Sequence, residues 1–149
     1  MKSETRAPSL GEMVPDAFPA FCRERALKCT AQRLAVFAAV RAAHGHPSVD
    51  EVWQAVRASL PTVTRESVYR ILNEFASWGL VGRLDALASA RYDRSSAPHT
   101  HFICEECGQI FDYPMPEGWR LPAKMAGEAR HVELRVTGVC RACQKKGMA

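Results

Sequence analysis

The 149-residue sequence contains no apolar run of about 18 residues, the length that predicts a membrane-spanning helix. Its first residues, MKSETRAPSLGEMVPD, lack the apolar core of a secretory signal, and no internal repeat or low-complexity tract is present. Hydrophobic residues nevertheless make up 47% of the chain, which is enough to form packed cores. We therefore expect a cytoplasmic, globular protein with one domain of ordinary size or two small ones.

The chain also lacks a strong net charge, since its formal charge is only +4. Residues 1–83 carry eleven Lys and Arg against eight Asp and Glu, whereas residues 84–149 carry nine against eight. A basic excess in the N-terminal half permits nucleic-acid binding there without establishing it.

Four segments of the N-terminal half have the start signals and the apolar spacing of helices: 16–28, 31–44, 49–60 and 65–78. Thr30 and Thr64 are N-cap residues, and Ser48 with Glu51 forms a capping box. The residues expected to face inward are Phe18, Phe21 and Leu27; Leu34, Phe37 and Ala38; Val52, Trp53, Val56 and Leu60; and Val68, Ile71, Leu72 and Phe75.

The segment 80–93, LVGRLDALASARYD, has the pattern of two short strands joined by a turn. Several helices followed by such a hairpin are typical of a winged helix, in which the helix beginning near residue 65 would face DNA. An ordinary helical bundle, with RESVYR as a solvated face, fits the same pattern. The order of elements alone does not separate these two interpretations.

The C-terminal part has the composition of a second, smaller domain. SSAP at 95–98 resembles a hinge, and strands are expected at 101–104, 109–114 and 131–139. Residues 118–129 favour a short helix, broken or bent at Pro122. We therefore predict a first domain at 1–94, a hinge at 95–98 and a second domain at 99–149, in an α+β fold.

Two Cys-x-x-Cys pairs lie in the second part of the chain, at Cys104 with Cys107 and at Cys140 with Cys143. In a reducing compartment such spacing favours metal ligation over disulfides, and four thiolates are typical of a closed structural zinc site. Four unrelated core cysteines are the alternative. A four-thiolate site has no open position, so it would stabilise the small domain rather than catalyse.

A second candidate metal set contains no sulfur. His99 and His101 are two residues apart, so on a strand they project from the same face, with Asp93 before them and Asp112 on the next strand. His46 lies far upstream. Nitrogen and carboxylate ligands suit Fe²⁺, Mn²⁺ or Zn²⁺. Each residue also has an ordinary structural interpretation, such as His46 in a turn or Asp112 bonded to a backbone amide.

With these residues in view, the chain resembles the ferric uptake regulator superfamily of bacterial metal-dependent repressors. The resemblance covers about residues 22–143. It is carried by TAQR (30–33), HPSVDEVW (46–53), SVYRILNEFASWGLV (67–81), RYD (91–93), HTHFICEECGQIFD (99–112) and GVCRAC (138–143).

The resemblance implies an N-terminal winged-helix DNA-binding domain and a small C-terminal α/β dimerisation domain, acting as a homodimer on double-stranded operators. It implies that bound metal selects the DNA-competent shape. It assigns structural zinc to the four paired cysteines. The regulatory metal, Fe²⁺ or Mn²⁺, is assigned to His46, Asp93, His99, His101 and Asp112.

The resemblance also suggests a branch of the family. Iron-responsive members commonly have glutamate at the position of Asp112, and aspartate there resembles the peroxide-responsive branch, in which iron-catalysed oxidation strikes the histidines matching His46 and His99. An iron, manganese or zinc uptake regulator without peroxide sensing is the alternative. The DNA contacts are expected from Arg65, Ser67, Tyr69 and Arg70, with Tyr69 against a thymine methyl.

Some features depart from the family. The region 113–139 is shorter than usual, which leaves the dimer geometry open, and Cys22 and Cys29 match no zinc ligand and are interpreted as buried thiols rather than redox switches. Two other classes remain as alternatives. A metalloenzyme would need a general base, and none stands at a recognisable spacing. A zinc-ribbon interaction protein would not bind DNA.

Overall fold

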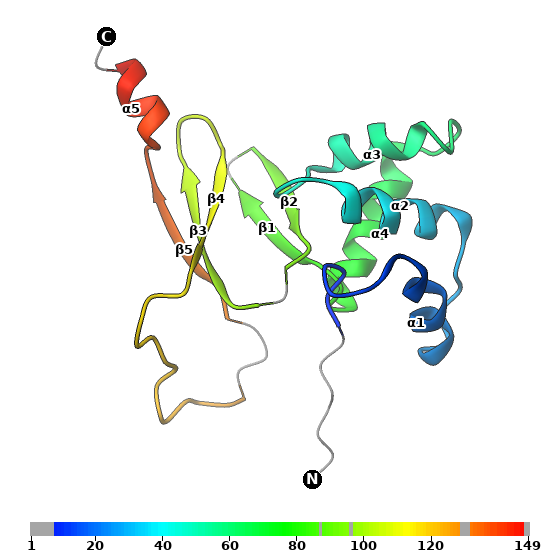
Figure 1. Ribbon diagram of the computed structural model, residues 1–149, viewed down its shortest axis with the longest axis horizontal. Helices are drawn as coiled ribbons and strands as arrows, with labels where there is room; N and C mark the ends of the chain where they lie inside the picture. Colours follow the sequence, from blue (N-terminus) through cyan, green and yellow to red (C-terminus); the bar gives the residue numbers. More distant parts are fainter. Residues whose placement is uncertain (1–7, 87, 96, 129–131, 148–149) are drawn as a thin grey trace. The chain divides into compact units, whose positions relative to one another are not determined.

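The computed structural model describes residues 8–86, 88–95, 97–128 and 132–147, and its chain separates into two compact units, Met1–Ser96 and Ala97–Ala149. We call them the helical unit and the sheet unit (Figure 1). Ser96, within the predicted hinge, lies outside the described residues. None of the helices in the described ranges combines the length and apolar character needed to cross a membrane.

The helical unit contains the four predicted helices, preceded by a short 3-10 turn, η1 (Pro15–Ala17). They are α1 (Phe18–Glu24), α2 (Ala31–Ala42), α3 (Val49–Arg57) and α4 (Arg65–Ser77). The predicted caps are confirmed. Thr30 accepts a hydrogen bond from the Arg33 amide, and Ser48 with Glu51 makes both bonds of a capping box. The first helix ends at Glu24, four residues before the predicted end. Cys29, interpreted from the sequence as a buried thiol, is therefore exposed in the segment after this helix, whereas Cys22 is buried as expected.

The core of this unit is built mainly from aromatic and branched side chains of the four helices. Phe18 stacks on Phe37 with ring centroids 4.7 Å apart and meets the edge of Phe75 at 5.5 Å. The predicted inner face of α4 is confirmed, since all four of its expected residues are buried. The inner face predicted for α2 was wrong at two positions. Leu34 and Ala38 are exposed, whereas Val36 and Val40 are buried. The helix therefore faces the core with the side that carries Val36, Phe37 and Val40.

The predicted hairpin follows α4. Strands β1 (Gly82–Ala86) and β2 (Ser89–Asp93) pair antiparallel, with Gly82 opposite Asp93. The loop before α3 is attached to β2 through a bridge between Ser48 and Arg91. Helices followed by this hairpin have the order of a winged helix.

The sheet unit contains a three-stranded sheet in the order β4-β3-β5. Strand β3 (His99–Cys104) pairs antiparallel with β4 (Ile110–Pro114) and parallel with β5 (Leu134–Gly138). A helix, α5 (Arg141–Gly147), follows β5 and was not predicted, because its first turn coincides with the second cysteine pair.

The predicted helix at 118–129 is absent from the described residues 115–128. Gly118 has a φ of 75°, a conformation that ends regular helix, and Pro122 and Gly127 interrupt the segment further. The α+β fold class is confirmed, since the helical unit joins four α-helices to a two-stranded hairpin and the sheet unit joins a three-stranded sheet to α5.

Candidate metal centres and nucleic-acid interface

The four paired cysteines come together at one end of the sheet unit. Cys104 Sγ lies 3.9 Å from Cys143 Sγ, Cys107 Sγ lies 3.9 Å from Cys140 Sγ, and all four sulfurs are within 4.8 Å of one another. A zinc ion with Zn–S bonds of about 2.3 Å in tetrahedral geometry separates its ligands by about 3.8 Å. The spacing therefore fits four thiolates on one zinc ion.

Backbone geometry forms this cluster. The Gly108 amide donates to the Cys104 carbonyl at 2.9 Å, and Gly108, with a φ of 70°, turns the chain into β4. The Glu105 amide donates to the Gly138 carbonyl at 2.8 Å, which holds the first cysteine pair against the end of β5. Because β3 and β5 are neighbours and parallel, the cysteine that ends β3 and the cysteine just after β5 meet at the same edge.

The electrostatics of the cluster favour thiolates at some positions and resist them at others. Backbone amides, first that of Cys107 and then that of Cys140 at 3.3 Å from Cys104 Sγ, lower the pKa of Cys104 to about 6. The neighbouring Cys140 thiol and burial raise the pKa of Cys143 to about 12. Four thiolates without a cation would also repel one another, and a bound divalent ion would offset that repulsion.

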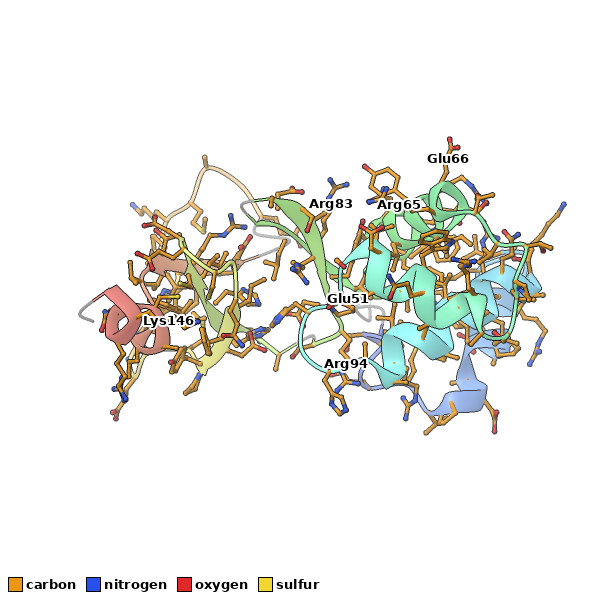
Figure 2. The ribbon with its side chains drawn as sticks, turned by 90° about the horizontal axis from the view of Figure 1, so that it is seen from above. Glu51, Arg65, Glu66, Arg83, Arg94 and Lys146 are labelled. Carbon is orange, nitrogen blue, oxygen red and sulfur yellow. The ribbon has the colours of Figure 1, made fainter. Side chains whose placement is uncertain are left out.

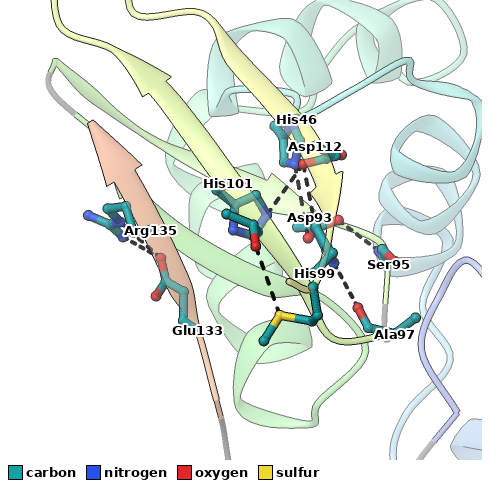
Figure 3. A network of polar contacts seen from close by, with 11 residues as sticks. His46, Asp93, Ser95, Ala97, His99, His101, Asp112, Glu133 and Arg135 are labelled. Atoms are coloured by element: carbon teal, nitrogen blue, oxygen red, sulfur yellow. Dashed lines mark hydrogen bonds and ion pairs between the residues drawn. The ribbon is translucent and has the colours of Figure 1, made fainter. Parts of the chain in front are cut away.

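The sheet unit also positions two histidines and one aspartate. His99 and His101 are two residues apart on β3, so their side chains share one face of the strand. Asp112 on β4 lies opposite His101 in the register (Figure 3). Oδ1 of Asp112 lies 3.5 Å from His99 Nε2 and 3.6 Å from His101 Nε2, and the two imidazole centroids are 4.3 Å apart. Two nitrogens and one carboxylate oxygen therefore converge on one small volume of this unit.

The tautomer of His99 follows from its partner. His99 Nδ1 lies 2.7 Å from the carbonyl oxygen of Ala97, which can only accept. Nδ1 therefore carries the proton, and the lone pair of the neutral ring is on Nε2, the atom directed toward Asp112. In metal sites, a ligating histidine is usually oriented in this way, by a hydrogen bond from its other ring nitrogen to a carbonyl or carboxylate oxygen.

The helical unit brings together the other two predicted ligands. His46 Nε2 lies 4.0 Å from Asp93 Oδ2, and Asp93 Oδ1 accepts a hydrogen bond from the Ser95 amide at 2.8 Å. The Tyr92 amide donates to the Pro47 carbonyl at 3.1 Å. This bond attaches the loop before α3, which carries His46, to the end of β2, which carries Asp93. Gly45, with a φ of 65°, makes the turn that leads into the loop.

Comparison with known proteins assigns the chain to a family. The model of the ferric uptake regulator family matches residues 24–136, most of the sequence. The chain belongs to the ferric uptake regulator family. This confirms the family resemblance drawn from the sequence and the class that it implies, a metal-dependent DNA-binding regulator.

Among curated members of this family, the chain is 33% identical over 129 residues to the peroxide-responsive repressor PerR of Staphylococcus aureus (strain Mu50 / ATCC 700699), covering 83% of this chain and 87% of that protein. The same identity and coverage are found with PerR of strain USA300. These relatives are repressors by name, in contrast to the metalloenzyme alternative.

Solved structures of family members share the fold. The ferric uptake regulator of Helicobacter pylori superposes with a TM-score of 0.68 at 23% identity, covering 87% of this chain and 90% of that one. A zinc uptake regulator in complex with zinc and DNA gives a TM-score of 0.59 at 23% identity, covering 91% and 95%. At these identities the likeness concerns the fold.

In this family member the four predicted DNA-contacting residues lie at the start of α4, where Tyr69 remains 40% exposed. Figure 2 shows Arg65 and Glu66 projecting from this region of the helical unit. Arg65 is already paired, since its Nε and Nη2 donate to the two carboxylate oxygens of Asp50 at 2.6 and 3.0 Å. Arg70 donates to Glu74 at 2.8 Å. A surface groove beside the helix is lined by Ser67, Tyr69, Arg70 and Asn73, among others.

Sequence reasoning missed one basic residue near this groove. Arg83 on β1 donates to Asn73 Oδ1 at 2.8 Å and to Asp85 at 3.0 Å, and its guanidinium carbon lies 5.9 Å from the centre of the Tyr69 ring. Hydrogen bonding with Asn73 and Arg83 lowers the pKa of Tyr69. No spacing in the sequence indicates this network, because Arg83 reaches Asn73 and Tyr69 only once β1 lies beside α4 in the folded unit.

Proposed function

We propose that the chain is a metal-dependent transcriptional repressor that senses peroxide through oxidation of histidines at its regulatory metal site. The observation that carries the proposal is the position of Asp112, whose carboxylate lies within 3.6 Å of both His99 and His101. The relatives named as peroxide-responsive repressors, at 33% identity, support the same branch. An iron, manganese or zinc uptake regulator is the alternative.

The proposal assigns structural zinc to the four cysteines. The sulfur spacing fits the ion, and an all-thiolate set leaves no position for a substrate. Zinc would then tie the turn after β3 to the end of β5 and the first turn of α5, in addition to the backbone pairing of the two strands. Folding of the sheet unit is thus linked to zinc binding.

The regulatory ion, Fe²⁺ or Mn²⁺, is assigned to His46, Asp93, His99, His101 and Asp112. Each unit holds part of this set, and neither part alone supplies the ligands that such ions take. An ion that takes ligands from both units makes metal binding depend on their arrangement. Metal would then select one shape of the protein from those available.

The remaining assignments follow from this role. We propose that the helical unit is the DNA-binding domain and that the sheet unit is the dimerisation domain of a homodimer. The pseudo-two-fold symmetry of an operator would then match the symmetry of the dimer. A repressor of this kind acts in the cytoplasm and has no enzymatic activity.

Within the proposed site the chain's own groups have separate tasks. Nε2 of His99 presents a lone pair because Ala97 fixes the proton on Nδ1. The carboxylates of Asp93 and Asp112 supply negative charge without a sulfur that an oxidant would attack. His46, Asp93, His99, His101 and Asp112 would hold the ion, Fe²⁺ would make the site reactive toward peroxide when bound, and an imidazole carbon of His46 or of His99 would accept one oxygen atom.

The direct test is a gel shift with an operator fragment, using protein prepared without oxygen. Protein loaded with Fe²⁺ or Mn²⁺ should retard the DNA, and chelated protein should not. Peroxide should release the DNA from the Fe²⁺ form alone. Release of neither form by peroxide would favour the uptake-regulator alternative, and binding without any divalent metal would contradict metal dependence.

A further inference from the structure

The first turns of α3 and α4 each carry one charged side chain that contacts the other helix. Asp50 stands in the capped first turn of α3, and Arg65 is the first residue of α4, directly after its cap Thr64. Trp53 Nε1 donates to the Val63 carbonyl at 3.0 Å, which holds the loop before α4 against α3. The caps and this bond fix the backbones of Asp50 and Arg65 relative to each other.

Arg65 and Asp50 form an ion pair through two parallel hydrogen bonds. Nε and Nη2 of Arg65 donate to Oδ1 and Oδ2 of Asp50 at 2.6 and 3.0 Å. Hydrogen bonding with Arg65 lowers the pKa of the Asp50 carboxyl, so this group is ionised at neutral pH. Exposed ion pairs contribute little to stability, and about half of each side chain is exposed here, so the fold gives little reason for the pair. Two parallel bonds do, however, hold the guanidinium plane in one orientation.

The pair uses only one edge of the guanidinium group. Arginine has five N–H donors, and Asp50 accepts from the one on Nε and from one of the two on Nη2. The remaining donors, on Nη1 and Nη2, form the outer edge of the planar group, directed away from the carboxylate. Two parallel N–H groups of this kind pair with O6 and N7 of guanine in the major groove. Asp50 therefore orients Arg65 and leaves available the edge that can recognise a base.

Arg65 lies at the end of α4 that is expected to face DNA. Figure 2 shows it projecting from the helical unit, and Tyr69, one helical turn further along α4, is 40% exposed. The other arginine expected to contact DNA, Arg70, donates to Glu74 of its own helix. The Arg65 pair differs because its carboxylate comes from another helix and engages the arginine with both oxygens. Pairing also neutralises a carboxylate that would otherwise repel the DNA phosphates.

We propose that Asp50 is a specificity-determining residue, which positions Arg65 to recognise a guanine of the operator. This inference rests on the proposed function, since it needs DNA at the first turn of α4. Asp50 is a positioning residue here, because it acts through Arg65 and not on the DNA. Loss of its carboxylate should therefore lower discrimination at one base pair without lowering the affinity for unrelated DNA.

The test uses the full-length protein loaded with Mn²⁺ and a duplex that the wild type selects from a random-sequence pool. Fluorescence anisotropy measures Kd for the selected duplex, for each of its single base-pair substitutions and for a scrambled duplex. In the wild type, replacing the recognised G·C pair should weaken binding by about 5- to 150-fold. In Asp50→Asn the same replacement should change Kd little, and the affinity for the scrambled duplex should not fall.

Variants of Arg65 show whether Asp50 acts through it. Arg65→Ala should lose discrimination at the same G·C pair, and the double variant with Asp50→Asn should lose no more. Arg65→Lys keeps the charge but not the planar fork, so it should lose this discrimination while the dependence of Kd on salt concentration stays the same. Asp16→Asn, which removes the same charge at an exposed position of η1, is the matched control and should keep the discrimination.

Discrimination retained at every G·C pair in Asp50→Asn would overturn the proposal. Equal gains in affinity for the selected and scrambled duplexes in Asp50→Asn and Asp16→Asn would also overturn it, because Asp50 would then act only through its charge. Loss of discrimination at a base pair other than the one lost in Arg65→Ala would do the same. Failure of the proposed function is seen separately, in the wild type, as selection of no duplex or as equal binding after chelation, and it would overturn both proposals.

Discussion

The Oδ1 atom of Asp112 lies 3.5 Å from Nε2 of His99, across the β3–β4 pairing of the sheet unit. The register of the two strands fixes this distance. Asp112 is opposite His101, and Pro114, two residues further along β4, is opposite His99. A longer carboxylate at this position would place its oxygens differently relative to both imidazoles while keeping the charge.

Asp112→Glu is therefore expected to keep metal-dependent operator binding but to lower the rate of histidine oxidation by peroxide, by about tenfold. Gel shifts with Mn²⁺ and peptide mass spectra after peroxide treatment of the Fe²⁺ form measure the two effects separately. Glu117→Asp, which exchanges the same two side chains at an exposed position outside the site, is the matched control. Oxidation at the wild-type rate in Asp112→Glu would remove the reason for assigning the peroxide branch to this residue.

Replacement of Cys104 by serine should release zinc and unfold the sheet unit, because Cys104 is buried and its sulfur accepts a hydrogen bond from the Cys140 amide. Zinc content and the circular dichroism melt should both fall, while the helical unit keeps its own core. Cys29→Ser controls for loss of a thiol elsewhere. A folded Cys104→Ser protein with a full complement of zinc would contradict the four-thiolate assignment.

Tyr69→Ala should weaken operator binding by about 1–3 kcal/mol, roughly 5- to 150-fold in Kd, if the exposed ring packs on a thymine methyl. The loss should be smaller on an operator with uracil in place of thymine, since the methyl group is then missing for the wild type as well. Tyr113→Ala, at an exposed tyrosine of the sheet unit, is the control. Equal affinities of Tyr69→Ala and wild type for the thymine operator would exclude the contact.

Ser48→Ala should lower the free energy of unfolding by about 1 kcal/mol, because it removes the acceptor of the Glu51 amide and breaks the capping box of α3. Urea denaturation measures the change. Ser77→Ala, at an exposed serine in the last turn of α4, should change stability by less than about 0.5 kcal/mol. If the two variants lost equal stability, the cap would not be the cause.

The caps at Thr30, Ser48 and Thr64 could be predicted because each depends on residues within three positions of one another. The inner face of α2 could not, because alanine and valine occur on every side of that helix and helical spacing does not distinguish its stripes. The helix expected at 118–129 failed for a related reason. Its apolar residues suggested a helix, but glycine and proline backbone preferences were given too little weight.

The candidate site shows the same division between local and tertiary information. The two cysteine pairs and the two histidines on one strand could be recognised from spacing alone. The ion pair between Arg65 and Asp50 and the hydrogen bond from Arg83 to Asn73 could not be recognised in this way, whereas Asp85 is a near neighbour of Arg83 in the sequence. These contacts join different elements, α4 to α3 and β1 to α4, which only the packed fold brings together. No fixed spacing in the sequence indicates such contacts.

Peptide mass spectrometry of Fe²⁺-loaded protein after peroxide treatment tests the proposed histidine chemistry most directly. His46 lies in the tryptic peptide 42–57, which also contains the exposed His44, and His99 lies in the peptide 95–120. One added oxygen atom is expected on His46 or His99, with His44 unmodified and the Mn²⁺ form unchanged at both histidines. Oxidation at His44 to the same extent, oxidation of the zinc cysteines alone, or no oxidation of histidine in DNA-released protein would contradict the account.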